Sequence, residues 1–405
     1  MKKITLLLLI CFIIIPNVFA NDGPGFSNRG FEFGFNANLG FSNNFVAATE
    51  IFKEIAVIDF DILQKNGFVL NLGFGATPLY FNINVKNNWG FGLSLGVDLN
   101  GVLSIPGSLF SLSQVENERI NISGAAYAAA QFSTFFHVSS IKMKVSPSMY
   151  MPIAIIVPDS YYTFNTSGGV LLDVNFDLKV FAPFNINNLL DSLNGSGSFT
   201  IPQFADLPKG FDFDFGFEYP LFKGFKVGLD IYNFPLISAK MEKYLEILAE
   251  IKIDRTYEEL FSGGSDEDLL YSNITQQFVE GGGLKYGAYR PMKTHLYAQW
   301  MPLGRFLTLT PIIGFSLAPY SENGKFSFGN FSLECGANVK IDLLNFLILQ
   351  FGVGYYDNFW KNSLDLALNL KIIELNVGVD LRSASFAQSW KGAGLGVNIG
   401  LKFGL

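Results

Sequence analysis

Large apolar residues alternate with small or polar residues along most of this chain, most strictly at its end. From Gly394 to Leu405 every odd position after the first glycine is apolar, and every even position is Gly, Asn or Lys. Such alternation marks a β-strand with one apolar and one polar face. The apolar members are Leu395, Val397, Ile399, Leu401, Phe403 and Leu405. We expect this last strand to close a β-barrel by pairing with Phe31 to Phe41, which alternates as cleanly.

The same pattern recurs often enough to predict about fourteen strands, and therefore an all-β protein built as an antiparallel transmembrane barrel. The clearest hairpin runs from Phe211 to Asn233. A shift of the apolar phase near Gly329 and Asn330 predicts a bulge. The other strand candidates are Ala56–Leu63, Phe68–Gly75, Leu79–Val85, Phe91–Leu99, Asn121–Val138, Ile141–Val157, Val170–Val180, Leu284–Trp300, Phe306–Leu317, Phe326–Ile341, Phe346–Tyr355, Leu364–Ile372 and Ile373–Leu381.

Three segments break the alternation. Phe45 to Ile55 predicts a few helical turns near the N-terminus, and Ala182 to Gly210 predicts a long loop rich in Asn, Gly, Ser and Pro. Residues 238–283 predict a partly helical insertion. Its apolar residues recur at helical spacing, and a second helical stretch from Asp266 to Glu280 ends at three glycines.

The first twenty residues have the form of a secretory signal peptide. Lys2 and Lys3 precede an apolar run from Ile4 to Ile15, and Val18 and Ala20 are the small residues before the expected cleavage site. The apolar run is too short for a membrane-spanning helix, which needs about 20 residues. The predicted domains are therefore residues 1–20, a signal peptide, and 21–405, the barrel.

Composition favours a barrel in a membrane over a soluble β-sandwich. The mean hydropathy is +0.29, and the chain has 43 Phe and 41 Gly but only 16% charged residues. Apolar residues spread by alternation, rather than gathered in long blocks, are what a membrane barrel requires. The net charge of −7 disfavours nucleic-acid binding. Outer-membrane lipid and the barrel-assembly machinery of a double-membraned bacterium are the expected partners.

Charged residues on the polar faces are the candidate lumen lining. The acids are Glu32, Asp98, Asp173, Asp177, Asp212, Asp214, Glu218, Asp230, Glu334, Asp365, Glu374 and Asp380, and the bases are Lys179, Lys226, Lys340, Lys371 and Lys402. Twelve acids against five bases predict a negative lumen, which favours cations if the pore is open. The alternative is that these charges only hydrate or cross-link the interior.

No catalytic or metal site is expected, and no cofactor. The chain has two His, His137 and His295, and neither has a nearby pattern of nucleophile or metal ligands. After cleavage Cys335 is the one cysteine left, on a face shared with apolar residues, so it is interpreted as a small apolar side chain.

The hairpin resembles one found in outer-membrane barrels of the FadL-like superfamily, which includes long-chain fatty-acid transporters and PorV-type barrels. The similarity lies in Gly210-Phe-Asp-Phe-Asp-Phe-Gly216, then Tyr219, then Phe225-Lys-Val-Gly228-Leu-Asp-Ile-Tyr-Asn233. The resemblance implies an N-terminal plug within residues 21–63 and a small hydrophobic ligand that passes through a partly plugged barrel. A water-filled, cation-preferring porin and a non-transporting scaffold or adhesin are the alternatives.

Overall fold

The computed structural model describes residues 29–44, 60–85, 88–111, 113–167, 169–186, 188, 203–256, 271–280, 283–390 and 393–405. The predicted signal peptide, the predicted helix at 45–55 and most of the predicted loop at 182–210 lie outside these ranges. No helix in the described part of the chain is long and apolar enough to cross a membrane.

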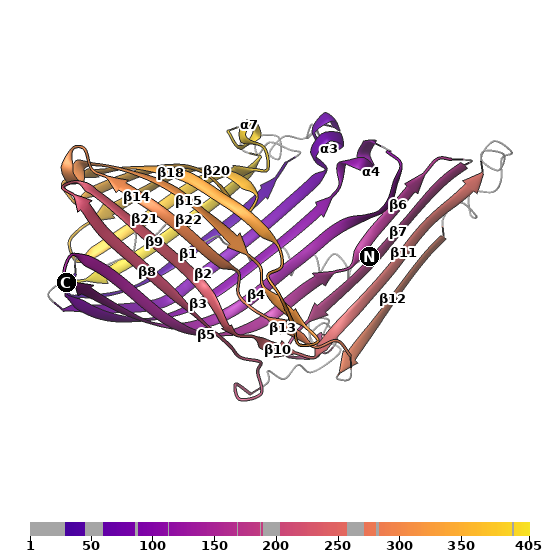
Figure 1. The fold of residues 1–405 in the computed structure, drawn as a ribbon, viewed down its shortest axis with the longest axis horizontal. Helices are drawn as coiled ribbons and strands as arrows, with labels where there is room; N and C mark the ends of the chain where they lie inside the picture. The colour runs from indigo at the N-terminus through magenta and orange to yellow at the C-terminus, as the bar shows by residue number, and fades with distance from the viewer. Residues whose placement is uncertain are drawn as a thin grey trace.

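Antiparallel ladders connect most of the strands into a closed ring (Figure 1). Four members of the 18-stranded sheet lie outside this ring, which leaves fourteen described strands within it. In ladder order these are β1 (Phe31–Asn43), β2 (Phe68–Val85), β3 (Trp89–Ile105), β4 (Val115–Val138), β5 (Ile141–Pro158), β8 (Gly210–Phe222), β9 (Phe225–Ile237), β14 (Met292–Trp300), β15 (Leu307–Leu317), β18 (Phe331–Leu343), β19 (Leu347–Tyr356), β20 (Phe359–Asn369), β21 (Ile373–Ser383) and β22 (Gly394–Gly404).

The ring closes where β22 pairs with β1, as the terminal alternation predicts. The register runs from Glu32 opposite Gly404 to Ser42 opposite Gly394. It places Ile399 beside Ala37 and Val397 beside Leu39 on the outer face, where Phe33 and Phe403 stack at 5.2 Å. An apolar outer face and a continuous ladder are the two requirements for a barrel wall in lipid.

Four strands form a wing beyond the ring: β6 (Ser160–Asn165), β7 (Gly169–Phe181), β11 (Lys243–Thr256) and β12 (Tyr271–Glu280). The long strands β4 and β5, of 24 and 18 residues, belong to both parts. β5 pairs with β8 up to Tyr150 and with β7 from Ile155 onward, so the wall forks between these residues. The wing therefore continues the sheet at one end of the ring (right in Figure 1).

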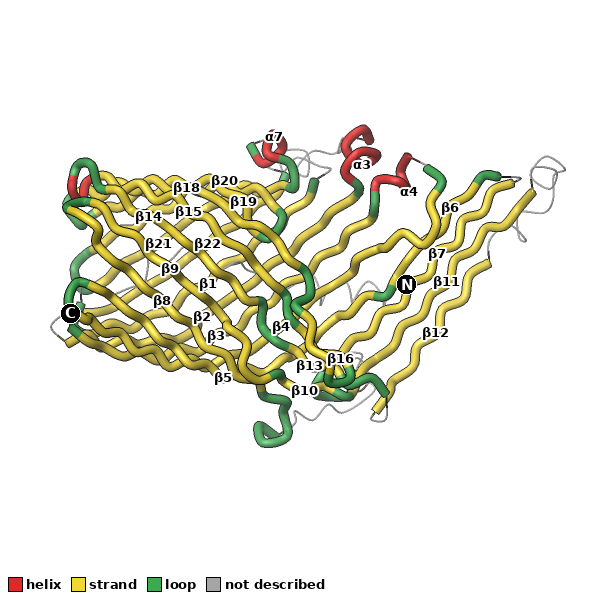
Figure 2. The backbone as a smooth tube through the Cα atoms, viewed as in Figure 1, coloured by secondary structure: helices red, strands yellow, loops and turns green. Residues whose placement is uncertain are grey.

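The remaining elements are short. A small sheet contains β10 (Ala239–Met241), β13 (Tyr286–Ala288), β16 (Tyr320–Glu322) and β17 (Lys325–Ser327). The helices within the described ranges are α3 (Phe60–Asn66), α4 (Gly107–Ser111), α7 (Phe386–Ser389) and the 3₁₀ turn η2 (Gly304–Phe306). The α-helices lie in connections at the end opposite the C-terminus (Figure 2).

The prediction of helices within residues 238–283 is wrong for the described part of that segment. Its apolar residues fit a helical period, but Leu245, Ile247, Ile251 and Ile253 also alternate with charged residues. As strand β11 this segment pairs along the whole of β7, and β12 pairs with β11. The long-range ladder decides between two periods that the sequence supports about equally.

Other boundaries differ in informative ways. The predicted strands Phe68–Gly75 and Leu79–Val85 form one strand, β2, with a register shift between Ala76 and Leu79. The strand predicted at Ala56–Leu63 ends as helix α3. Within the predicted plug region, β1 is part of the wall, so only residues outside the described ranges and part of α3 remain available for a plug.

Replacing Ile399 with Lys tests the outer face near the seam. A cation at the bilayer midplane of a barrel exterior costs about 2–4 kcal/mol, so the variant should unfold at lower denaturant concentration in lipid vesicles. Asn376→Lys is the control, because Asn376 is paired with Gly400 and its amide donates to Glu374 at 3.2 Å on the inner side. Equal stability of the two variants would contradict the outward orientation of Ile399.

Candidate functional site

The inner wall of the ring is the candidate site. The two-residue period of each strand determines which side chains point into it. On β1, Phe33 is 42% exposed on the outer face, whereas its neighbour Glu32 is only 7% exposed. The same alternation buries Asp212, Asp214 and Glu218 on β8. Polar residues of the alternating strands therefore face one another across the interior.

Arg290 is at the centre of the first charge cluster. Its guanidinium donates to both carboxylate oxygens of Asp212 at 2.7 and 2.8 Å, and to the Ser148 hydroxyl at 2.8 Å. It also lies over the Tyr150 ring, 5.6 Å from the centroid. The neighbouring Asp214 accepts from the Gln131 amide at 2.6 Å. A bidentate, buried pair of this kind fixes β8 relative to the segment before β14.

Lys293 joins a second cluster. Its ammonium lies 2.7 Å from Asp357 and 3.3 Å from Glu334, which is fully buried. His295 Nε2 is 2.5 Å from the other oxygen of Glu334. Asp230, a predicted lumen residue on β9, is buried and lies opposite His295 in the β9–β14 ladder.

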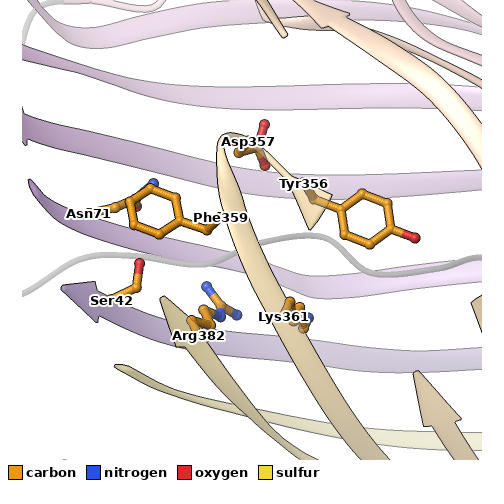
Figure 3. A pocket seen from close by; sticks show the side chains of 7 residues that line it. All are labelled: Ser42, Asn71, Tyr356, Asp357, Phe359, Lys361 and Arg382. Atoms are coloured by element: carbon orange, nitrogen blue, oxygen red, sulfur yellow. The ribbon is translucent and has the colours of Figure 1, made fainter. Parts of the chain in front are cut away.

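The third cluster surrounds Asp380, which contacts Lys361 at 3.2 Å and the Arg382 guanidinium in a bidentate pair. Asp365 lies nearby and accepts from the Asn398 amide at 2.7 Å. Lys361 and Tyr356 line two adjoining pockets whose other lining residues are mostly polar. Figure 3 shows the first, with Asn71 and Asp357 among its lining residues.

Two further clusters lie toward the end of the ring that carries the C-terminus. Arg29 lies 3.8 Å from both Glu32 and Glu374, and Lys402 is 2.9 Å from Glu374. Glu218 lies 3.1 Å from Lys226 and 3.7 Å from Lys142.

Four of the predicted lumen charges do not lie on the inner wall, and one of them, Lys371, is exposed in the turn between β20 and β21. Asp173, Asp177 and Lys179 belong to β7 in the wing, where Lys179 contacts Asp177 at 2.8 Å and Glu246 at 3.4 Å. The alternation of β7 is as regular as that of a ring strand, because the wing continues the same sheet. The alternation of apolar and polar residues identifies a strand with one apolar and one polar face, but it does not identify the strands with which it pairs.

The predicted excess of acid on the inner wall was overestimated, because several cations were missed. Asp98, on β3, lies within electrostatic reach of Arg290, a residue that the sequence did not single out. The other missed cations are Arg29, Lys142, Lys144, Lys293, Lys361 and Arg382. Lys142 and Lys144 alternate with Ile141 and Met143, so their period was available as a signal. Arg290 precedes the strand β14, where no period identifies it.

Glycines on the inner wall leave room for tyrosine rings on adjacent strands. A Cβ at Gly210 would lie 2.2 Å from the Tyr150 ring, and one at Gly228 would lie 2.1 Å from the Tyr297 ring. The Tyr150 hydroxyl lies 3.0 Å from the carbonyl oxygens of both Ile237 and Ala288. Because these glycines have no side chain, the large rings can lie close to the backbone of the wall.

An apolar cluster occupies the fork in the wall. Tyr127 and Tyr150 meet edge to face at 5.9 Å, and Phe181 is fully buried beside Tyr244. The remaining buried members are Ile155, Ala239, Met241 and Ala288. This is a packed apolar, aromatic cluster at the level where β5 changes its partner.

Comparison with known proteins gives matches to solved structures alone; no family model and no curated protein matches the chain. The Pseudomonas putida toluene transporter TodX matches with 9% identity over 95% of this chain and 90% of its own, at a TM-score of 0.44. The Ralstonia pickettii toluene transporter TbuX matches with 10% identity over 94% of this chain and 90% of its own, at a TM-score of 0.47. A Pseudomonas aeruginosa FadL homologue matches with 10% identity over 93% of this chain and 90% of its own, at a TM-score of 0.44. Likeness at this level assigns neither a ligand nor a residue role.

Arg290→Met tests the buried pair. Removing the guanidinium leaves Asp212 buried without its cation, which should lower the free energy of unfolding by about 3–5 kcal/mol. The double variant Arg290→Met, Asp212→Leu should recover much of this loss. Lys252→Met is the comparison, because its partner Asp254 is exposed, and its loss should stay below about 1 kcal/mol. Equal losses in the two single variants would contradict the importance of the buried pair.

Gly210→Ala tests the seat of the Tyr150 ring. The added methyl must displace the ring and strain its hydrogen bonds, with an expected loss of about 1–3 kcal/mol in denaturant unfolding. Gly96→Ala is the matched control, because its nearest neighbour is the Ala76 carbonyl oxygen at 3.7 Å. If both variants are as stable as the parent, Tyr150 does not depend on that glycine.

Proposed function

We propose that this chain is a bacterial outer-membrane channel for small hydrophobic molecules. The closed ladder with an apolar exterior supports a membrane-spanning wall, because lipid offers no partner to backbone N–H and C=O groups. The signal peptide predicted at residues 1–20 supports export. The observation that carries the choice of solute is the aromatic cluster around Tyr127 and Tyr150 at the fork.

An apolar cluster within an otherwise ion-paired interior favours a hydrophobic solute. Burying apolar surface of a solute against aromatic rings yields roughly 25 cal/mol per Å². The polar pockets beside Lys361 offer no comparable gain. A solute that moves these buried side chains apart would therefore reside longest at the fork, where the ladder of β5 passes from β8 to β7.

The cation-preferring porin is less well supported. Its basis was an excess of acid, and Glu32, Asp212, Asp214, Glu218, Glu334, Glu374 and Asp380 each have a basic residue within 4.0 Å. Such pairs cross-link strands and reduce the net potential that selects cations. A scaffold or adhesin would use the wing instead of the interior.

Binding of the fluorescent hydrophobe 1-N-phenylnaphthylamine to the purified barrel tests the proposal. The probe should gain emission with saturable binding, and Met241→Gln should weaken binding several-fold, because it introduces an amide into the apolar cluster. Met292→Gln is the control, as Met292 precedes the inward-facing Lys293 by one residue on β14 and thus faces outward. Planar-bilayer conductance measured on the same preparation separates a channel for hydrophobes from a wide aqueous pore.

Two outcomes would contradict the proposal. One is a large, steady, cation-selective conductance without probe binding, which would support the porin. The other is absence of both conductance and probe binding in a correctly folded barrel, which would support the scaffold.

A further inference from the structure

At one end of the ring the turn from β4 to β5 is polar, with Ser139 and Ser140, but four other short turns carry large, exposed apolar side chains. These turns connect β8 to β9, β14 to β15, β18 to β19 and β20 to β21, at the end where β22 finishes. We name this set the short-turn rim; its apolar members are Leu221, Phe222, Leu303, Phe306, Leu344, Phe346, Leu370, Ile372 and Leu405, all exposed. Turns that project into water are normally polar, so this rim requires an explanation.

Leu344 is the extreme case. It is 94% exposed and has a φ of 60°, followed by Asn345 at 57°. Both central positions of this type I′ turn favour Asn, Asp or Gly, because a Cβ strains a left-handed backbone. Leucine here is unfavourable both in conformation and in exposure to water. Contact of its side chain with an apolar phase would offset the exposure.

Basic residues lie between these apolar residues. Lys223, Arg305 and Lys371 occupy three of the four turns, and all are exposed. One acidic side chain reaches these turns: the Asp342 carboxylate accepts from the Asn345 backbone N–H at 2.7 Å, and in the described part of the chain none of the three cations forms an ion pair. The local charge is thus positive in a chain whose net charge is −7.

We propose that the short-turn rim is a docking surface for anionic phospholipid, immersed in the adjoining leaflet of the membrane. The inference rests on the proposed membrane barrel but is independent of its solute. The rim is continuous with the apolar outer face, since Leu405 lies directly after β22, two residues beyond Phe403, and its backbone N–H donates to the Phe31 carbonyl at 3.0 Å.

The residue chemistry fits such a surface. Leu and Phe insert among acyl chains, while Lys and Arg extend their charged ends to phosphate groups at the membrane surface. Each basic residue near an anionic leaflet gains electrostatic attraction. Trp89 and Trp300, at the rim ends of β3 and β14, are half exposed and belong to the residue type enriched at membrane interfaces.

Spin labels at single cysteines test the depth of the rim in vesicles that contain phosphatidylglycerol. In a Cys335→Ser background, a label at Leu344→Cys should collide with oxygen and be shielded several-fold from a water-soluble nickel chelate. A label at Asn323→Cys, in the turn between β16 and β17 toward the opposite end, should show the reverse accessibility. Nickel accessibility at 344 equal to that at 323 would overturn the proposal, and would favour a rim that projects into water toward a protein partner.

A third label, at Ile399→Cys, distinguishes the two proposals. Ile399 lies on the outer face of the seam strand. If its label is shielded while that at 344 is not, the docking proposal alone fails. If labels at both 399 and 344 are open to the chelate, the membrane barrel itself fails.

The lipid preference is tested with Trp89 and Trp300 as reporters, in a Trp360→Phe, Trp390→Phe background. Brominated phosphatidylglycerol should quench their emission more strongly than brominated phosphatidylcholine in an equal mixture. The variant Lys223→Gln, Arg305→Gln, Lys371→Gln should lose this difference, whereas Lys65→Gln, Lys240→Gln, Lys325→Gln should keep it. No difference between the two lipids in the parent protein would overturn the anionic preference.

Discussion

The ring depends on the need of each of its strands for two hydrogen-bonded neighbours. In hydrocarbon, an unpaired backbone N–H or C=O has no water to satisfy it, so a sheet there must close on itself. The ladder between β22 and β1 meets this requirement, because it joins the first described strand to the last. The outward Phe and Leu residues, the inward charges and the aromatic rings are all placed by this register, and a slip of one residue would exchange the two faces.

The interior is organised by compensation of charge. Buried ion pairs contribute little net stability, since desolvation offsets most of the attraction, but losing one partner is strongly destabilising. Asp212, Glu334 and Asp380 each hold two strands or segments together through a cation on another element. These contacts make the wall specific in register and leave the aromatic cluster at the fork as the main apolar surface inside it.

Sequence reasoning succeeded where a single strand contains its own evidence. The alternation of β1 and β22 identified both strands and their pairing, and the hairpin of β8 and β9 followed in the same way. It failed where the answer depends on a distant partner. β7 alternates like a ring strand yet lies in the wing, and β11 satisfies two periods until β7 pairs with it. The cation Arg290 was missed because its role comes from Asp212, 78 residues away in the chain.

The fork at β5 has a consequence for the order of assembly. In the chain, β7 lies in the insertion between ring strands β5 and β8, and β11 lies in the insertion between β9 and β14. The ladder between β7 and β11 therefore joins two separate insertions. The wing therefore forms only after the strands through β9 are present, even though the first of its strands is made early. Contacts between segments this far apart close slowly, because a long loop must first lose its conformational entropy. Until β11 arrives, β7 is left with an uncovered edge, so this intermediate is the stage most exposed to wrong pairing during biogenesis.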